Sequence, residues 1–483
     1  MWSRTRVIRG IGIGMLLVTG VWVLWWGTSR MRDHRVSPIG TPERYNIVWI
    51  TLCSVRADHL SAYGYTRKTS PILEFIAQRG VRFRWNFAQA PWTLPSVSSM
   101  LSSRSVSELV FRTRKVSRNM VFHFPGVLPD DTLISEILQR HGYHTIAVVG
   151  GFVGEPTGFR QGWDVFHYVQ GNLGKKFQLL FQEIRRSRRQ PFFAFIFSND
   201  AHYPYGRLHT PARHLFTRQT LDINISRKLI HAFYRGDRTL SREEKAYLIA
   251  LYDEMLFWVD HHLWRLWRFL EQTGMLRRTI IVINADHGES FGEHGHIGHG
   301  RSYFNTEVRV PLVWYVPNLP RPGRVIRRAV QNLDIVPTLL DLVGIPPPIP
   351  LRGTSLRPYL FPGSGPPVPG QRRIFIEGAH APIPGAIVRF PWKLILHGRE
   401  RYLFQIVRDP RERHNLFRHR SDVATRLERF LITHIVASGL RRRLRIGADT
   451  EGPQLWMDRV IRGMNLRDHP EMLEQLRALG YIQ

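Results

Sequence analysis

Apolar runs of strand length alternate with segments of helical spacing along the first two thirds of the chain. The clearest strand is "YNIVWITLC" at residues 45–53, and "SPILEFIAQRGVRF" follows it as a helix, a glycine and a second strand. The same order returns in "DTLISEILQRHGYHTIAVVGG". Strands that are apolar at consecutive positions are typical of a sheet covered on both faces. The pattern therefore predicts an α/β fold with a mostly parallel sheet between two layers of helices.

Two later strands extend this pattern and end in polar residues. They are "QPFFAFIFSND" and "RRTIIVINADHGES", and a long amphipathic helix that is stopped by Gly274 precedes the second. Parallel sheets bind their ligands at the carboxyl ends of the strands. We therefore expect the groups that follow these strands to meet the groups that follow residues 45–53.

These three strand ends carry side chains that can bind a metal ion or transfer a proton. They are Cys53 and Ser54 at the first end, Asn199, Asp200 and His202 at the second, and Asp286, His287, His294, His296 and His299 at the third. An adjacent Asp–His pair after a buried strand can place both side chains near one cation. Each residue alone has an ordinary explanation, such as a solvated loop, but their joint placement favours a functional site.

A separate stretch, "APWTLPSVSSML" at residues 90–101, predicts the start of a helix at Thr93. Threonine at such a position is either an N-cap or a nucleophile presented by the helix. Taken alone, the residue is more typical of an N-cap, because its hydroxyl can accept a bond from the first helical turn.

The N-terminus predicts a membrane anchor. A basic segment, "MWSRTRVIRG", precedes a run without charge at residues 11–28, which at about 1.5 Å per residue nearly crosses a hydrocarbon core of about 30 Å. Trp25 and Trp26 lie at its far end, where aromatic belts occur. Because no small-residue cleavage site follows, we expect an uncleaved anchor over 1–28 and a polar linker over 29–44. The chain is then a single-pass protein of the cell membrane, with its main domain outside the cytoplasm.

The charge balance predicts anionic partners. Lys and Arg together number 68 and Asp and Glu 38, which gives a net charge of +30. Such a surface attracts acidic glycans or anionic lipids. Nucleic acid is not expected, because no zinc-finger spacing or RNA-binding signature accompanies the charge. The single cysteine, Cys53, excludes an intrachain disulfide.

The last part of the chain predicts a second, smaller unit. Residues 344–372 are rich in proline and glycine and are interpreted as a long surface connection after a main domain over 45–343. Beyond them, "RRIFIEGA", "GAIVRF" and "WKLILHG" predict antiparallel strands in a C-terminal subdomain over 373–483, followed by a basic helical segment.

Ten motifs that appear in order from Tyr45 to the C-terminus resemble the sulfatases and their phosphoester relatives in the alkaline-phosphatase superfamily. These motifs are "ITLCSVRADHLSAYGY", "GVRFRWNFAQAPWTLPSVSSML", "NDAHYPY", "INADHGESFGEHG…GHG", "VRVPLVWY", "DIVPTLLDLVGI", "RGTSLRP", "WKLILHG", "DPRERHNL" and "LRALGY". The resemblance implies an alkaline-phosphatase-like sandwich with a smaller C-terminal antiparallel sheet. It also implies metal-assisted attack on sulfuric or phosphoric esters by a nucleophile at a helix start.

In this resemblance Thr93 takes the nucleophile position. Sulfatases carry there a cysteine or serine that is oxidised to formylglycine, and threonine is not a substrate of that oxidation. Val97 also replaces the arginine of the sulfatase motif. Phosphotransferase and phosphodiesterase relatives do carry threonine, so the resemblance implies a Thr-nucleophile branch and favours a phosphate-type ester.

The resemblance also implies a divalent metal. Asp286 and His287 match the family's metal pair, with the Thr93 hydroxyl as a further ligand, and the histidine favours zinc or manganese over calcium. Cys53 stands where the family has a ligating aspartate. It is either a thiolate ligand, which zinc accepts, or the mark of a lost ligand.

Three further positions follow from the same resemblance. His202 matches the histidine that touches the ester oxygens, and His299 matches a second histidine of this branch. Arg301 is the candidate replacement for a substrate-binding lysine.

These observations predict a membrane-anchored, metal-dependent hydrolase or transferase of the sulfatase family that acts on a sulfuric or phosphoric ester. Water as the final acceptor makes it a hydrolase, and an alcohol makes it a transferase. Two alternatives stay open. One is a sulfatase that works without formylglycine. The other is a catalytically degenerate protein that binds an anionic glycan or lipid, which Cys53 and Val97 favour.

Overall fold

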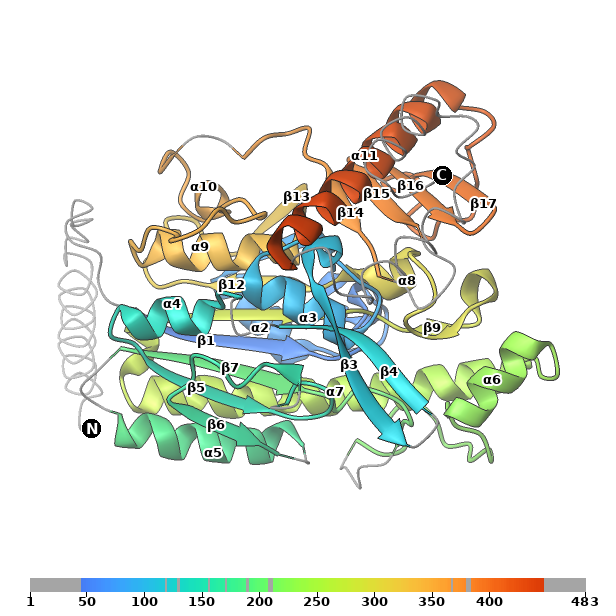
Figure 1. Ribbon diagram of the computed structural model, residues 1–483. Coiled ribbons are helices and arrows are strands. Elements are labelled where there is room, and N and C mark those ends of the chain that lie inside the picture. Colours follow the sequence, from blue (N-terminus) through green and yellow to red (C-terminus); the bar gives the residue numbers. More distant parts are fainter. Residues whose placement is uncertain are drawn as a thin grey trace, which may run out of the picture. The chain divides into compact units, whose positions relative to one another are not determined.

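The computed structural model describes residues 45–446 except for eight short internal segments (Figure 1). These segments are 118–119, 128–130, 155–156, 170–171, 188–190, 207–211, 366–367 and 379–383. The expected anchor at 1–28 and linker at 29–44 lie outside the described residues. Within the described part of the chain, no helix combines the length and the apolar character that a membrane span needs.

A nine-stranded mixed sheet lies at the centre, in the order β11-β2-β12-β8-β1-β7-β5-β6, with β13 beside β2. Its strands are β1 (Asn46–Leu52), β2 (Val81–Phe87), β5 (His144–Val149), β6 (Val165–Tyr168), β7 (Phe192–Ser198), β8 (Thr279–Ala285), β11 (Arg309–Val310), β12 (Leu312–Tyr315) and β13 (Arg324–Gln331). Strands β8, β1, β7, β5 and β6 run parallel to one another, and β12 runs antiparallel between β8 and β2. The prediction of a mostly parallel sheet is therefore confirmed.

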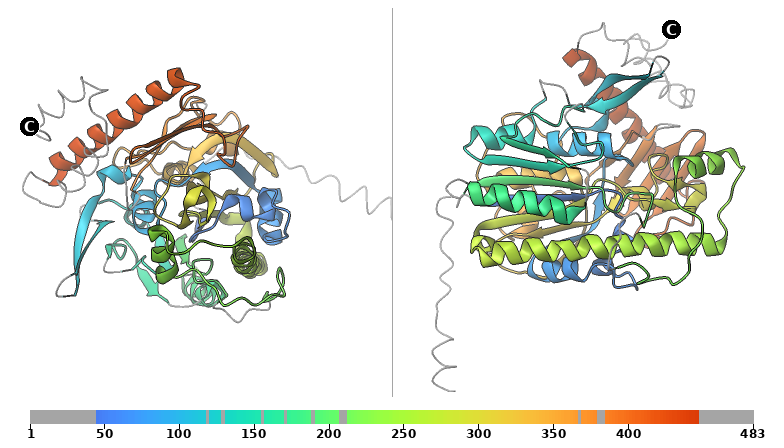
Figure 2. Two further views of the ribbon diagram at one scale, coloured as in Figure 1. Left: turned by 90° about the vertical axis from the view of Figure 1, so that its right-hand side faces the viewer. Right: turned by 90° about the horizontal axis from the view of Figure 1, so that it is seen from below.

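Helices cover both faces of this sheet, as the alternating pattern predicted. One face is covered by α2 (Pro71–Arg79), α5 (Leu173–Arg186) and α7 (Arg242–Gln272), while α6 (Arg227–Arg235) lies beyond this face and contacts β10 (Ile297–Gly298). The other is covered by α3 (Thr93–Ser102), α4 (Ile134–Arg140), α9 (Ile335–Leu342) and α10 (Arg357–Leu360). In the view from below, α5 and α7 lie side by side across the first face (Figure 2).

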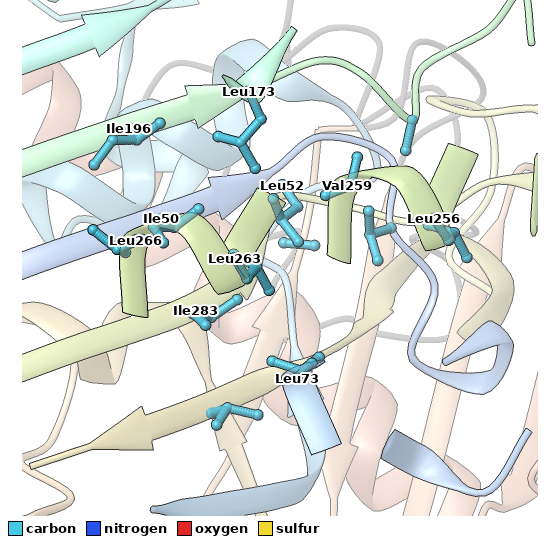
Figure 3. Close-up of a cluster of buried hydrophobic side chains, with 14 of the residues drawn as sticks. Ile50, Leu52, Leu73, Leu173, Ile196, Leu256, Val259, Leu263, Leu266 and Ile283 are labelled. Atoms are coloured by element: carbon cyan, nitrogen blue, oxygen red, sulfur yellow. The ribbon is translucent and has the colours of Figure 1, made fainter. Parts of the chain in front are cut away.

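Strand β1 is buried at every position and divides its side chains between the two cores. Ile50 and Leu52 pack with Leu263 of α7 on one side (Figure 3), and Trp49 packs toward α3 on the other. Because side chains alternate along a strand, Cys53 continues the Trp49 face. The two-residue period of β1 therefore directs Cys53 toward α3 at the sheet edge.

A four-stranded antiparallel sheet follows in the C-terminal part, as predicted. Its strands are β14 (Ile374–Ile376), β15 (Gly385–Arg389), β16 (Trp392–His397) and β17 (Glu400–Gln405). The helix α11 (Ser421–Ile446) covers one face, and the other face packs on Trp85 and Phe304 of the main sheet region.

The remaining strands and α-helix are short and lie outside the two main sheets. They are the hairpin β3 (Val110–Ser117) and β4 (Met120–Gly126), the two-stranded β9 (Ser290–Phe291) and β10 (Ile297–Gly298), and the helix α8 (Asn305–Val308).

The proline- and glycine-rich segment 344–372 is attached to the main domain at several points. Leu356 and Leu360 are fully buried in the core, and the Arg352 guanidinium pairs with the Glu108 carboxylate. The domain boundaries at 343/344 and 372/373 stay predictions.

A buried ion pair joins the C-terminal sheet to α8. Lys393 Nζ lies 2.7 Å from Glu412 Oε1 and donates to Asn305 Oδ1 at 2.9 Å, and both charged side chains are at most 1% exposed. Lys393→Ala would leave the Glu412 carboxylate buried without its cation. We expect the free energy of unfolding to fall by about 3–5 kcal/mol.

The measurement is chemical denaturation of the full chain in detergent. The double variant Lys393→Met/Glu412→Gln removes both charges and keeps an acceptor for the Asn305 backbone N–H, which donates to Glu412 Oε2. It should lose less stability than Lys393→Ala. A Lys393→Ala protein as stable as the wild type would contradict the structural role of the pair.

Candidate active site

The register of three parallel strands, β1, β7 and β8, brings the residues that directly follow them side by side at one edge of the sheet. Leu52 of β1 pairs with Ser198 of β7 on one side and with Ala285 of β8 on the other. The residues that follow, Cys53, Asn199 and Asp286, therefore begin together at the carboxyl edge of the sheet. This confirms that the three polar strand ends meet.

Thr93 is the first residue of α3 and does not serve as its N-cap. Trp92 occupies the N-cap position, and no side chain caps this helix. The Thr93 side chain instead lies at the sheet edge, with Oγ1 3.6 Å from Cys53 Sγ and 3.3 Å from His287 Nε2. The N-cap interpretation of Thr93 was therefore wrong, because the extended residue before it takes that position.

Four donor atoms from three segments surround one small space. Besides the two Thr93 distances, Cys53 Sγ lies 3.8 Å and Asp286 Oδ2 lies 3.5 Å from His287 Nε2. A tetrahedral ion with bonds of about 2.0–2.3 Å holds its donors about 3.3–3.8 Å apart. The four separations match this spacing, so the residues present fit a tetrahedral metal ion such as zinc.

The hydrogen bonds of Asp286 leave one carboxylate oxygen for such an ion. Oδ1 accepts from the backbone N–H groups of Ser54 at 3.1 Å and His287 at 2.8 Å. Oδ2 is fully buried and has no hydrogen-bond partner among the described residues. A buried carboxylate oxygen without a partner is costly, and a cation would satisfy it.

The ring of His287 is oriented in the same way. Its Nδ1 donates to the Gly288 carbonyl oxygen at 2.8 Å, which leaves the Nε2 lone pair toward the donor cluster. Gly288 is required by close packing, because a Cβ there would lie 2.1 Å from the Thr306 carbonyl oxygen.

Burial also shifts the protonation of these ligands. It raises the pKa of the Asp286 carboxyl, lowers the pKa of His287 to about 3, and raises the pKa of the Cys53 thiol, which the Asp286 charge raises further. Without a cation the thiol is therefore neutral, whereas a divalent ion at the cluster favours its deprotonated form.

His202 and His299 extend the cluster away from the sheet. The His299 ring lies 4.3 Å from the His287 ring and 4.9 Å from the His202 ring, measured between centroids. His202 Nδ1 donates to the Tyr203 carbonyl oxygen at 2.6 Å, and His299 Nδ1 lies 3.0 Å from Glu289 Oε1. The structure thus groups both histidines with His287.

Other polar residues of the three strand ends have different surroundings. The His294 ring stacks on Phe304 at 3.9 Å, and the His296 ring lies 5.6 Å from His397. The Asp200 carboxylate accepts from the backbone N–H of Leu173 at the start of α5. The Arg301 guanidinium lies over the Tyr234 ring at 4.3 Å, and its substrate-binding role stays a prediction.

Sequence reasoning missed two buried residues beside the site. Glu289 contacts His299 and lies two positions after His287 in "ADHGES", which is the one signal that could have found it. Lys176 of α5 is fully buried, and its Nζ donates to the Phe197 carbonyl oxygen at 2.8 Å and to Asn199 Oδ1 at 3.3 Å. Nothing in the spacing of α5 distinguishes it from a surface lysine.

A central mostly parallel sheet, a small C-terminal antiparallel sheet and a helix-borne hydroxyl facing metal-type donors together define an alkaline-phosphatase-like α/β protein. The family model named Sulfatase matches residues 45–345. The chain therefore belongs to the sulfatase family, whose members are ester hydrolases of the alkaline phosphatase superfamily and use a divalent metal.

Two of the relatives match shorter parts of the chain than the family model does. An N-acetylglucosamine-6-O-sulfatase of Bacteroides thetaiotaomicron is 30% identical over 168 residues, which cover 33% of this chain and 30% of that protein. The multifunctional alkaline phosphatase superfamily protein PehA of Trinickia caryophylli is 28% identical over 208 residues, 41% of this chain and 40% of that protein. The chain thus matches well under half the length of both relatives.

The fold is shared with solved structures over most of its length. The phosphonate monoester hydrolase of Agrobacterium radiobacter superimposes with a TM-score of 0.63 at 19% identity, over 82% of this chain and 96% of that one. At this identity the likeness supports the fold alone.

Proposed function

We propose that this protein is a metal-dependent hydrolase or transferase that acts on a phosphoric ester, with Thr93 as the nucleophile. The observation that supports the proposal is the placement of the Thr93 hydroxyl at the start of α3, 3.3 Å from His287 Nε2 and within the donor cluster. A hydroxyl so placed can attack an ester held at the helix N-terminus, where backbone N–H groups attract an anion.

Cys53, Thr93, Asp286 and His287 would hold the metal ion, with zinc or manganese favoured over calcium. When bound, the ion lowers the pKa of a hydroxyl beside it and offsets the charge of an ester oxygen. The soft sulfur and the imidazole nitrogen favour a borderline metal, since calcium prefers oxygen ligands alone.

The chain's own groups account for the chemical steps. The Thr93 hydroxyl gives its proton to solvent, and Oγ1 then forms a bond to phosphorus while the bond to the leaving oxygen breaks, which gives a Thr93 phosphoester. His202 and His299 hold the ester oxygens and return a proton to the leaving oxygen. Water or an alcohol then displaces Thr93 from phosphorus, and the Thr93 oxygen takes a proton back from solvent.

The nucleophile favours one type of ester, and the net charge of the chain favours one type of molecule that carries it. Threonine cannot supply the aldehyde hydrate that formylglycine sulfatases use, so phosphate is favoured over sulfate. The net charge of +30 and the N-acetylglucosamine-6-O-sulfatase among the relatives favour an anionic glycan or lipid as the carrier of the ester. With the anchor expected at residues 1–28, we place the reaction at the outer face of the cell membrane.

The second candidate is a degenerate family member that binds an anionic glycan or lipid without turnover. It is favoured by Val97, which is fully buried in the core where sulfatases carry an arginine. The retained Thr93, Asp286, His287 and two further histidines oppose it.

The test uses the full chain purified in detergent, with metal content measured by mass spectrometry and turnover measured on matched nitrophenyl esters. We expect about one zinc or manganese ion per chain. We also expect faster hydrolysis of 4-nitrophenyl phosphate or bis(4-nitrophenyl) phosphate than of 4-nitrophenyl sulfate, by about tenfold or more, which corresponds to about 1.4 kcal/mol. Faster sulfate hydrolysis would indicate a sulfatase without formylglycine. No turnover and no metal would favour the binding protein.

A further inference from the structure

A buried carboxyl group, Glu289, lies directly behind one of the site histidines. Glu289 is 0% exposed, its Oε1 lies 3.0 Å from His299 Nδ1, and its Oε2 accepts from the Tyr205 hydroxyl at 2.9 Å. A carboxyl group in such a position costs several kcal/mol unless its partners offset the burial. Each of its oxygens therefore has one defined partner, and one of these is an imidazole.

The neighbouring Arg56 does not offset the burial of the Glu289 carboxyl group by a direct ion pair. Arg56 directs its guanidinium to the carboxylates of Asp58 and Glu293, both at 2.9 Å, and reaches Glu289 only at its backbone carbonyl oxygen. The side chain of Glu289 thus belongs to His299 and Tyr205 rather than to the Arg56 ion pairs.

The three site histidines differ in what binds their Nδ1 atoms. His287 and His202 each donate to a backbone carbonyl oxygen, whereas His299 faces a carboxyl group. A backbone carbonyl fixes a tautomer but carries no charge. A carboxyl group also stabilises an imidazole that holds protons on both nitrogens, and such an imidazole can donate from Nε2.

We propose that Glu289 is a positioning residue for His299, and that this pairing makes His299, rather than His202, the proton donor to the leaving oxygen. The inference rests on the proposed function. As the bond between phosphorus and the leaving oxygen breaks, its electron pair goes to that oxygen, which takes the proton from His299 Nε2. When water or an alcohol displaces Thr93, His299 accepts the proton of the attacking hydroxyl.

Tyr205 keeps the carboxyl group in place. The Tyr205 backbone N–H donates to Asn224 Oδ1 at 2.8 Å, and the Asn224 amide donates back to the Tyr205 carbonyl oxygen at 2.6 Å. The Tyr205 ring packs against Tyr252 and Phe291, and Tyr205 is 2% exposed. The buried Tyr205 side chain therefore holds the Glu289 carboxyl group in position beside His299.

The test compares esters that differ in their need for a proton. Glu289→Gln keeps the size of the side chain and an acceptor for Nδ1–H but can no longer take a negative charge when His299 holds two protons. We expect kcat to fall by about 10²-fold or more on phenyl phosphate, whose leaving oxygen needs a proton, and to change little on 2,4-dinitrophenyl phosphate. KM and metal content should stay near the wild-type values. Tyr205→Phe should act in the same direction with a smaller loss.

Glu293→Gln is the matched control, because it removes a carboxylate of the same loop that pairs with Arg56 and contacts no site histidine in the described residues. It should leave the dependence on the leaving group unchanged. His299→Asn should reproduce the Glu289→Gln pattern, and His202→Asn should slow both esters alike. An equal loss on both esters for Glu289→Gln, or the selective loss for His202→Asn, would overturn the inference.

A proton NMR measurement separates this inference from the proposed function. The hydrogen between Glu289 and His299 Nδ1 should give a low-field imidazole resonance that is lost in Glu289→Gln and in His299→Asn. A wild-type protein without turnover on any phosphoester would refute the proposed function and the proton transfer together. Turnover without that resonance, or without the selective loss, would refute the role of Glu289 alone.

Discussion

Replacing Thr93 with alanine should lower the rate of phosphoester hydrolysis by about 10⁴-fold or more, because the attacking oxygen is removed. The Thr93 hydroxyl lies 3.6 Å from Cys53 Sγ and 3.3 Å from His287 Nε2, and no other hydroxyl has a recorded contact with both atoms in the described residues. Turnover of 4-nitrophenyl phosphate under saturating metal measures the loss.

Two variants make this result specific. Thr93→Ser keeps the hydroxyl and should retain far more activity than Thr93→Ala. Ser98→Ala is the matched control, since Ser98 is fully buried on the same helix and its hydroxyl has no hydrogen-bond partner among the described residues. Its removal should be nearly neutral for activity and stability.

The covalent intermediate gives a second measurement of the same prediction. Acid quenching of the wild type during turnover should trap a phosphothreonine at position 93, detectable by peptide mass spectrometry. Thr93→Ala with wild-type turnover, or a phosphoryl group trapped at another residue, would contradict the assignment of the nucleophile.

Much of the main sheet was predictable because its central strands are buried on both faces. Strand β1 is buried at all seven positions, so its apolar run was readable without knowledge of its neighbours. The antiparallel β12 was not predictable in the same way. Pro311, which has no N–H to donate, separates β11 from β12 along the chain, which leaves runs of two and four residues whose direction depends on the neighbouring strands β2 and β8.

The candidate site was predictable at the level of strand ends, and less so at the level of side chains. Asp286, His287 and Cys53 meet because the register of parallel strands brings them together, and register follows from the strands themselves. The loop after β8 is different. Gly292, Gly295 and Gly298 have positive φ, and these turns send His294 and His296 to Phe304 and His397 while His299 returns to the site. No periodicity in the sequence indicates which of these three histidines lies at the site.

Replacing Cys53 with aspartate should change which metal the protein binds. The wild-type cluster combines one sulfur, one nitrogen and two oxygens, and four of their separations match a tetrahedral ion, which suits zinc. Cys53→Asp replaces the soft donor with a hard one and restores the ligand type of the wider family. We expect zinc affinity to fall by about 100-fold or more, since loss of an outer-shell partner alone costs about 10–100-fold, with a relative gain for manganese or calcium.

Direct metal titration of the full chain in detergent measures both affinities, and cobalt substitution tests the sulfur ligand without any need for turnover. The wild type should show a thiolate-to-cobalt charge-transfer band in the near ultraviolet that is lost in Cys53→Ser, a variant of nearly the same size. Zinc binding should also release a proton from the Cys53 thiol, because burial keeps that thiol neutral in the metal-free protein. A Cys53→Asp protein that binds zinc more tightly than the wild type would mean that the cysteine marks a lost ligand. The chain would then keep the sulfatase fold around a weakened metal site, and the binding protein would become the better account of its function.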